Sequence, residues 1–343
     1  MAASLSCGLT LTASASTPPP PTEPESGSDA GQAMEIVESW ALVPGGGPNG
    51  EEIGTRSALA YSAAPGTVVE DSVVVVNYGN VPAVYTVYAA DAKNNEEGGF
   101  DLLPGDQAST DLGSWISVSQ TEVAVPPGRQ AVIPITISIP LDATPGDHVA
   151  GIVASNPTES ETNSGPSVIV DRRTGVRVYL RVDGPLDPSL AITDLTTTYE
   201  HAVNSLRGSA DVSFTVENRG NVRIGGTPTV SIGGPLGLGA KKLQLDTFEE
   251  ILPGQRANFS VRLEGVPALF LNTTTVSISP DPQAGADLPK AFVGKDRFFA
   301  PPITFLVILF AVALGVLGWR RPRGRRADEL GEQGDVEREP QLQ

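Results

Sequence analysis

The sequence is poor in the side chains that metal sites and acid–base catalysis need. It has two histidines and one cysteine. His148 and His201 lie far apart, and neither has a second histidine or a cysteine nearby, so no transition-metal site or cofactor is predicted. Cys7 has no partner for an intrachain disulfide. A serine hydrolase would lack a base to activate its serine, and the chain is predicted not to be an enzyme.

Positive charge is also scarce. The chain has 23 Lys and Arg against 40 Asp and Glu, a net charge of −17. From Arg320 onward the two signs are equal in number, so all of the excess negative charge precedes that residue. Such a surface repels the phosphates of nucleic acid, and nucleic acid is excluded as a partner.

Sustained helical periodicity is missing before residue 300, and short alternating runs take its place. Apolar residues at Ile133, Ile135 and Ile137 alternate with Pro134 and Thr136, and the run 176–182 repeats this pattern. A period of two indicates antiparallel strands with one buried face. Together with 37 glycines and 30 prolines, it predicts an all-β fold.

The β region contains an internal repeat. Asn-x-Gly-Asn-Val occurs at 77–81 and at 218–222, each after a similar strand, and Pro-Gly follows at 127–128 and at 253–254 before a second similar strand. We expect the Asn-x-Gly-Asn turns to use positive φ. Two motifs in the same order predict two tandem immunoglobulin-like β-sandwiches, at 35–184 and 185–281, joined at Asp183-Gly184-Pro185.

The longest apolar run lies near the C-terminus. No charged residue occurs between Arg297 and Arg320, a length of roughly 33 Å as a helix, and a cluster of arginines follows. This predicts a transmembrane helix at 300–319, a cytoplasmic tail at 320–343 and a type I membrane protein. Residues 282–299 are predicted to be a stalk.

The N-terminal end resembles an exported protein. An apolar segment leads to Ala13-Ser14-Ala15, which predicts a signal peptide over 1–15. No basic residue precedes it, and our hypothesis is that its front is truncated. Residues 16–34, rich in Pro, Ser, Gly and Glu, are expected to be a disordered leader.

Two polar regions invite functional interpretations. For the acidic residues Asp91, Glu96, Glu97, Asp101 and Asp106 we favour a solvated loop over a weak calcium site, and both over paired-carboxylate catalysis. For 156–167 we favour a solvated excursion over a contact loop.

Residues 35–184 resemble the N-terminal, peptidoglycan-binding domain of the WxL-interacting proteins, which are cell-surface proteins of Gram-positive bacteria. The resemblance rests on Tyr61 with Pro65-Gly66, Asn77-x-Gly79-Asn80, Trp115-Ile116 and Pro127-Gly128, and above all on Pro-Gly-Asp-His-Val-Ala-Gly-Ile at 145–152 and Gly-Val-Arg-Val-Tyr-Leu-Arg-Val at 175–182. It implies binding of peptidoglycan or of a wall protein with Trp-x-Leu motifs.

We therefore predict a non-enzymatic, membrane-anchored surface protein that binds peptidoglycan, a wall-associated protein, or both. The alternative is a scaffold that binds secreted proteins by β-strand addition without glycan binding. No residue is assigned to ligand contact. Trp115 could stack on a sugar, but a tryptophan before Ile116 in a strand is expected to pack between the sheets.

Overall fold

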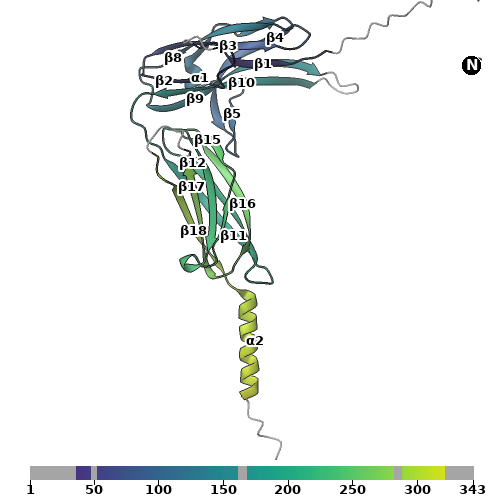
Figure 1. Ribbon diagram of the computed structural model, residues 1–343, viewed down its shortest axis with the longest axis vertical. Helices are drawn as coiled ribbons and strands as arrows, with labels where there is room; N and C mark the ends of the chain where they lie inside the picture. Colours follow the sequence, from purple (N-terminus) through teal and green to yellow (C-terminus); the bar gives the residue numbers. More distant parts are fainter. Residues whose placement is uncertain (1–35, 48–51, 161–167, 282–287, 321–343) are drawn as a thin grey trace, which may run out of the picture. The chain divides into compact units, whose positions relative to one another are not determined.

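The computed structural model describes residues 36–47, 52–160, 168–281 and 288–320. The predicted signal peptide, the leader, and the tail beyond Arg320 lie outside these ranges. Two hydrophobic cores form in the described chain, one from residues between Leu42 and Val182 and one from residues between Leu190 and Ile278. The predicted fold class is confirmed: two immunoglobulin-like β-sandwiches precede one long apolar helix (Figure 1).

The first sandwich packs a four-stranded sheet against a six-stranded sheet. The first sheet has the order β1 (Trp40–Pro44), β3 (Val68–Asn77), β8 (Gln130–Ser138), β6 (Ile116–Val118). The second has the order β2 (Leu59–Ala63), β10 (Val168–Val182), β9 (Gly146–Ser160), β4 (Ala83–Asn94), β5 (Phe100–Leu102), with β7 (Glu122–Val125) also on β4.

The second sandwich has a three-stranded and a five-stranded sheet. The smaller sheet has the order β11 (Leu190–Glu200), β12 (Gly208–Asn218), β16 (Arg256–Val266). The larger has the order β14 (Lys241–Gln244), β13 (Ile224–Gly233), β17 (Phe270–Pro280), β18 (Phe292–Ala300), with β15 (Phe248–Ile251) on β13. A 3-10 turn, η1 (Pro235–Gly237), follows β13.

The strands follow the alternation of apolar side chains. In β8, Ile133, Ile135 and Ile137 are buried while Pro134 between them is exposed, and β12 buries Val212, Phe214 and Val216 in the same way. Period-two alternation places every second side chain in the core between the sheets. The burial pattern therefore matches the one read from the sequence.

The repeated asparagine forms the same hydrogen bonds in both sandwiches. The Asn77 amide, 2% exposed, donates to the carbonyls of Val81 at 2.9 Å and Val125 at 3.0 Å. The Asn218 amide, 1% exposed, donates to Val222 and to Ile251, both at 2.8 Å. Each side chain thus joins the end of one strand to a strand of the opposite sheet, to which no backbone ladder connects it.

The glycine of each repeat is needed for a reason that we did not predict. Gly79 and Gly220 do not have positive φ. A Cβ on Gly79 would lie 2.4 Å from the Val37 carbonyl oxygen, and one on Gly220 would lie 2.0 Å from that of Asp187. The close approach lets the backbone of each turn bond the segment that enters β1 or β11. Positive φ occurs instead at Gly128 and Gly254, in the Pro-Gly turns.

The register of the repeat is confirmed. Val75 pairs with Ala131 and Val73 with Ile133 in the first sandwich. Val216 pairs with Ala257 and Phe214 with Phe259 in the second. The Pro-Gly turns therefore start β8 and β16 at equivalent positions.

The predicted stalk at 282–299 is wrong in its second half. β18 pairs antiparallel with β17, from Phe270 opposite Ala300 to Ile278 opposite Phe292. Phe292 and Phe298 pack against the second core. Gly294 and Asp296 occupy two of the inward positions of β18. Because neither side chain is apolar, the sequence does not show the alternation of apolar and polar residues that marks a strand. Residues 282–287 lie outside the described chain.

The polar segment 156–167 is strand in part. β9 continues to Ser160 and β10 starts at Val168, with Asn156 opposite Arg172. Ladder hydrogen bonds join backbone groups whatever the side chains are, so the polarity of 156–160 does not end the strand. Residues 161–167 lie outside the described chain.

The long helix α2 (Ile303–Arg320) begins three residues later than predicted because β18 runs to Ala300 and two prolines follow. Its mean hydropathy is 2.2, and none of that span is buried. A core helix of a soluble protein would be mostly buried. The length and composition of α2 suit a membrane span.

We expect Asn77→Ala to lower the free energy of unfolding of the first sandwich by about 2 kcal/mol, because two buried carbonyls lose their donor. Asn218→Ala should do the same to the second sandwich. Thermal unfolding of the full chain in detergent micelles measures both changes. Tyr78→Ala is the control, since this side chain of the same turn is 64% exposed. Equal effects of Asn77→Ala and Tyr78→Ala would contradict the prediction.

Candidate functional site

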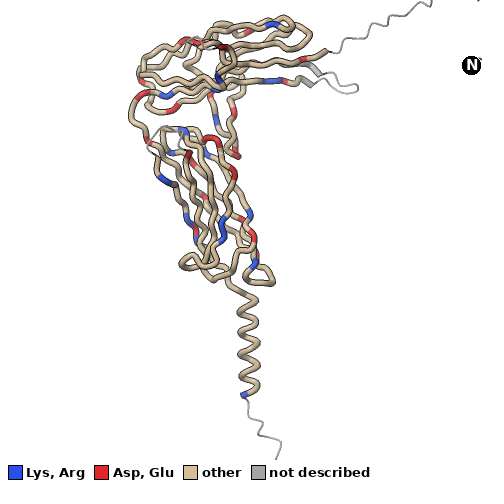
Figure 2. The backbone as a smooth tube through the Cα atoms, viewed as in Figure 1, with Lys and Arg blue, Asp and Glu red and all other residues tan. Residues whose placement is uncertain are grey.

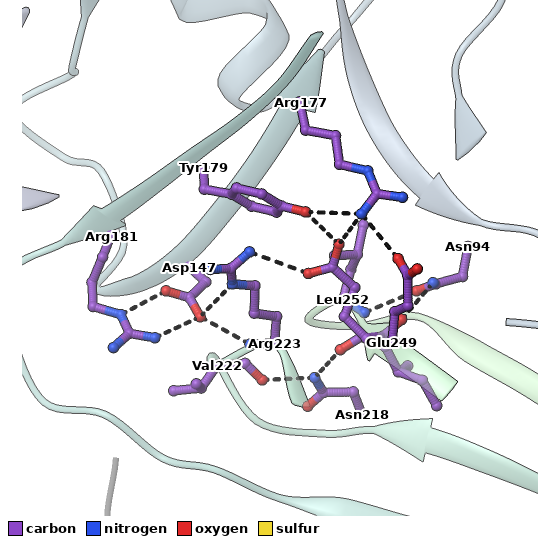
Figure 3. Close-up of polar contacts among 12 residues, drawn as sticks. Asn94, Asp147, Arg177, Tyr179, Arg181, Asn218, Val222, Arg223, Glu249 and Leu252 are labelled. Atoms are coloured by element: carbon purple, nitrogen blue, oxygen red, sulfur yellow. Dashed lines mark hydrogen bonds and ion pairs between the residues drawn. The ribbon is translucent and has the colours of Figure 1, made fainter. Parts of the chain in front are cut away.

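Strand β10 belongs to the first sandwich, and one of its faces contacts the second sandwich. Its side chains at Val176, Val178, Leu180 and Val182 are buried in the first core. The alternate residues Arg177, Tyr179 and Arg181 point from the other face (Figure 3). Arg177 and Tyr179 contact Glu249 and Glu250 of the second sandwich, and Arg181 pairs with Asp147 of the neighbouring strand β9. β10 therefore supplies one wall of a polar junction between the sandwiches.

The first part of the junction is centred on Asp147 of β9. Arg181, which lies opposite Asp147 in the ladder, donates from Nε at 2.7 Å and from Nη2 at 2.8 Å to the two carboxylate oxygens. The backbone N–H of Arg223, in the second sandwich, donates to Oδ2 at 3.0 Å. The two segments that carry the family resemblance thus pair with each other and hold one carboxylate.

The second part of the junction is centred on Glu250 of β15, which is 7% exposed. Its Oε1 accepts the hydroxyl of Tyr179 at 2.6 Å, and its Oε2 accepts Nη1 of Arg223 at 3.2 Å. The Arg223 guanidinium lies 3.7 Å from the centre of the Tyr179 ring, in cation–π geometry. Arg177 Nη1 lies 3.8 Å from Oε1. A buried carboxylate is thus matched by cations from both sandwiches (Figure 3).

The third part of the junction is Asn94, the last residue of β4. Its amide donates to the carbonyls of Glu250 at 2.9 Å and Gly98 at 3.1 Å, and its Oδ1 accepts the N–H of Leu252 at 2.8 Å. The side chain acts as a strand partner for the backbone of the second sandwich.

Close backbone approach completes the junction at Gly146 and Asn221. The Asp147 N–H donates to the Asn221 carbonyl at 2.7 Å. A Cβ on Gly146 would lie 2.2 Å from that carbonyl oxygen, and the φ of Gly146 is 121°. A side chain at position 146 would therefore separate the two sandwiches.

Two pKa shifts follow from the contacts of the junction. Burial and the hydrogen bond to Glu250 raise the pKa of Tyr179. The hydrogen bond to Asp147 outweighs burial and raises the pKa of Arg181. Both changes hold these groups in the protonated forms that make the contacts. In the part of the chain that the structure describes, no group of His, Cys, Asp and Glu is suited to a metal ion.

Beyond the junction, β10 has an edge with no pairing strand among the described residues. β2 pairs with Val178–Val182 only, and no described strand pairs with residues 168–177 on that side. The Asp183 N–H points to β2, bonding Ala63. Because strand peptide groups alternate in direction, those of Asp171, Arg173 and Gly175 point outward along the same edge. These groups can pair with a further strand.

A hollow of about 470 Å³ adjoins this edge. Its apolar wall comes from Phe100 and Leu102 of β5 and Val153 of β9, and its polar wall from Arg173 and Arg177 of β10. Gly175 lines the hollow without a side chain, and a Cβ at this position would lie 3.1 Å from the Leu102 side chain. The hollow can take side chains of a segment that pairs with β10.

Basic residues are concentrated on β10 although the chain is acidic (Figure 2). Arg172 contacts Glu38 at 3.1 Å, and Arg173 contacts Asp171 at 3.6 Å. These four side chains are between 28% and 53% exposed. Exposed ion pairs of this kind contribute little and can exchange partners.

His148 lies on β9, as expected, but it is buried and has two partners. Nδ1 lies 2.6 Å from Oδ1 of Asp111, and Nε2 lies 2.8 Å from the Thr144 carbonyl. Both partners are acceptors, so both ring nitrogens donate when the ring is protonated. Burial opposes that charge, but the hydrogen bonds to Asp111 and Thr144 outweigh it and raise the pKa of His148. His201 is exposed beside the Tyr199 ring.

Trp115 is not in a strand. It ends the short helix α1 (Leu112–Trp115) and is half-buried, packing against the first core and against the His148 ring at 4.7 Å. The preference for a packing role agrees with this position. The prediction that Trp115 lies in a strand is wrong, because β6 begins one residue later, at Ile116.

The five acidic residues do not form one loop. Asp91 is 8% exposed on β4, and its carboxylate accepts the N–H groups of Thr110, Asp111 and Gly113 at 2.6–2.9 Å. It holds the backbone that leads into α1. Glu96 contacts the second sandwich, since its carbonyl accepts the Asn258 N–H at 2.8 Å. Glu97 and Asp106 are exposed, as a solvated loop requires, and Asp101 is exposed on β5.

Sequence analysis missed Asn94, Arg223 and Glu250. One signal was available for Glu250, which occupies an inward position between Phe248 and Ile251 in a strand. An acidic residue at such a position requires a paired cation. For Asn94 and Arg223 no local signal exists, because their contacts with Glu250, Leu252 and Asp147 join segments far apart in the sequence.

No protein-family model matches the chain, and a search of curated proteins finds no match. Among solved structures, the chain is similar to the chaperone–tip adhesin complex of CFA/I fimbriae, with 10% identity over 75% of this chain and 98% of that chain and a TM-score of 0.38. It is also similar to the class 5 fimbriae chaperone CfaA, with 12% identity over 69% of this chain and 96% of that chain and a TM-score of 0.36. The Pseudomonas aeruginosa chaperone CupB2 is similar with 10% identity over 72% of this chain and 98% of that chain and a TM-score of 0.32. At this similarity, the fold class of the chain rests on its own sheets and cores.

Glu250→Gln should lower the stability of the junction by about 2 kcal/mol, because it leaves Arg177 and Arg223 without their buried counter-charge. Both guanidinium groups are about one third exposed, and solvent screening keeps the loss from being larger. Differential scanning calorimetry of the full chain should show the melting of the two sandwiches separating. Glu249→Gln is the matched control: Glu249 also contacts Arg177 but is 75% exposed. Identical melting of both variants would contradict this role for Glu250.

The pH dependence of stability should report His148. Its pKa is raised from 6.5, so its contribution is complete below that value and is lost as the pH rises through the pKa of the folded state. The melting temperature should therefore fall between pH 6 and 8.5, and His148→Gln should flatten this dependence. His201→Gln is the control. An unchanged slope in His148→Gln would show that other groups cause it.

Proposed function

We propose that this chain is a non-enzymatic, membrane-anchored binding protein whose first sandwich takes an extended protein segment along the free edge of β10. The observation that carries the proposal is the unpaired edge at 168–177 beside a hollow with one apolar wall. Strand addition provides main-chain hydrogen bonds along an edge and places alternate side chains in pockets.

The other edges of the first sandwich are poorer templates. β1 has five residues and β6 has three. Short edge strands offer few unpaired groups and limit pairing with other chains.

The long edges of the second sandwich carry features that oppose pairing. β11 has a bulge between Thr193 and Thr196, with Asp194 at φ 50°. On β16, the Asn258 N–H already donates to the Glu96 carbonyl. Arg262 of the same strand is ion-paired with Asp211 on the exposed face. Bulges and charged side chains are common protections of edge strands. β11 and β16 are therefore poorer templates than the edge of β10.

The hollow favours a segment with two large apolar residues on one face. Residues two apart in a strand lie on the same face, about 6.6 Å apart. A Trp-x-Leu sequence has this arrangement, and Phe100, Leu102 and Val153 provide apolar contacts for it. The resemblance to WxL-interacting proteins thus suggests a partner that the geometry of β10 can accept.

Membrane anchoring by α2 completes the proposal. The arginines after Trp319 favour a cytoplasmic C-terminal end, which places both sandwiches outside the cell. The site on β10 would then face wall-associated proteins. Peptidoglycan, implied by the family resemblance, is the alternative ligand.

The test uses Arg173→Pro and Arg173→Ala in the full chain. Proline removes the outward N–H of position 173, whereas alanine removes only the side chain, and β9 pairing is kept in both. A 12-residue peptide containing Trp-x-Leu should bind the wild type and Arg173→Ala, and binding should fall at least tenfold in Arg173→Pro. Fluorescence anisotropy of the labelled peptide measures this.

Two controls sharpen the result. Ser260→Pro places proline on the edge of β16 and should leave binding unchanged, and a peptide with Trp and Leu adjacent should bind weakly because these residues then lie on opposite faces. Sedimentation with insoluble peptidoglycan covers the alternative. If wild type and Arg173→Pro both sediment with peptidoglycan and the wild type does not bind the peptide, strand addition at β10 is overturned and the glycan is favoured as the ligand.

A further inference from the structure

The end of the second sandwich next to α2 exposes a group of large apolar side chains. Val203 lies between β11 and β12, Leu236 and Leu238 lie in and after η1, and Phe270 and Leu271 begin β17. Val203 is 91% exposed and Leu236 is fully exposed. We call these five residues, with Leu206, the apolar collar.

The topology places the collar beside the start of α2. Phe270 lies opposite Ala300 in the ladder of β17 and β18, and α2 starts three residues after Ala300. The Thr304 hydroxyl donates to the Val203 carbonyl. A hollow of about 730 Å³ is lined both by collar residues and by Phe305 and Ile308 of the helix. The collar and the first turns of α2 therefore form one apolar surface.

Backbone strain supports a role for this exposure. Leu236 has φ 56° and Phe270 has φ 62°, in the left-handed region. This conformation is unfavourable for a residue with a side chain, and it is rare for bulky ones. Of the three described non-glycine residues with positive φ, two are thus exposed members of the collar. The fold holds large apolar groups outward at a cost, which requires a compensating environment.

The length of α2 indicates what that environment is. Its 18 residues span roughly 27 Å, slightly less than a hydrocarbon core of about 30 Å. Arg320 limits the apolar span at the C-terminal end. The apolar layer must then extend past Ile303 toward the sandwich, where the collar lies.

The charged residues next to the collar agree with a position at the membrane surface. A polar hollow of about 790 Å³ shares Leu206 with the collar and is lined by Arg207 and Lys241, with Glu264 as its acidic member. Within the described residues, no ion pair involves Arg207, Lys241 or Lys242. Basic residues next to an apolar rim suit the level of lipid phosphates.

We propose that the apolar collar is embedded in the headgroup and acyl boundary of the membrane that α2 spans, in the leaflet on the side of the sandwich. The second sandwich is then seated on the bilayer and not suspended above it. Burying the collar removes large apolar side chains from water, which is favourable. This proposal depends on the membrane span and not on strand addition at β10.

The test places a nitroxide spin label at single cysteines of the full chain, in a Cys7→Ser background, with one protein per lipid nanodisc. Leu236→Cys and Leu238→Cys report the collar. Val312→Cys, in the middle of α2, is the lipid control. Leu141→Cys is the matched aqueous control, because Leu141 is also an exposed loop leucine, 87% exposed, in the first sandwich. Collision with lipid-soluble oxygen and with a water-soluble nickel chelate is measured for each label.

The collar labels should collide with oxygen more often than the Leu141 label, and their collisions with nickel should fall several-fold. Agreement between Leu236→Cys and Leu238→Cys excludes an effect of one altered loop. Nickel accessibility equal to that at Leu141 would overturn the proposal, while the label at Val312 shows that the helix is inserted. Protection that needs two proteins in one nanodisc would overturn it as well, since it would assign the collar to a second copy of the chain.

Discussion

Three buried asparagine side chains make hydrogen bonds that the strands cannot make among themselves. Asn77 and Asn218 each link the end of one strand to carbonyls of the opposite sheet, and Asn94 links the first sandwich to the backbone of the second. Unpaired carbonyls and N–H groups at these places would each lose their hydration without compensation. The carboxamide supplies both donors and an acceptor in one planar group, and so it holds elements that no ladder connects.

Around these links, a single strand serves several purposes. One face of β10 fills the first core, the other face supplies the cations and the tyrosine of the junction, and its outer edge stays unpaired at 168–177. The ion pairs of Arg181 with Asp147 and of Arg177 with Glu250 hold the face of β10 that lies against the junction. A partner strand would therefore meet a rigid edge, which lowers the entropy lost on binding. At the other end of the second sandwich, strained apolar loops meet the membrane helix. The chain thus separates its proposed protein-binding edge from its proposed lipid-binding end.

Much of the architecture could be predicted because period-two alternation is a local property. The strands around Ile133–Ile137 and Phe214, and the equivalent register of the two Pro-Gly turns, follow from neighbouring residues. Prediction failed where the inward side chains are not apolar. β18 was missed because Gly294 and Asp296 occupy inward positions, and Asp91 was placed in a loop because its partners are backbone N–H groups about 20 residues away.

By itself, the sequence determined the all-β class, the duplicated Asn-x-Gly-Asn and Pro-Gly turns, and one apolar segment able to span a membrane. These depend on the periodicity and hydropathy of adjacent residues. Only the tertiary structure decided which carboxylates are buried and which cations match them, because Asp147, Arg223 and Glu250 meet across distant segments. It also decided why the glycines of the motif are needed. A close approach between backbones is a property of two segments, and only one of them is visible in the motif.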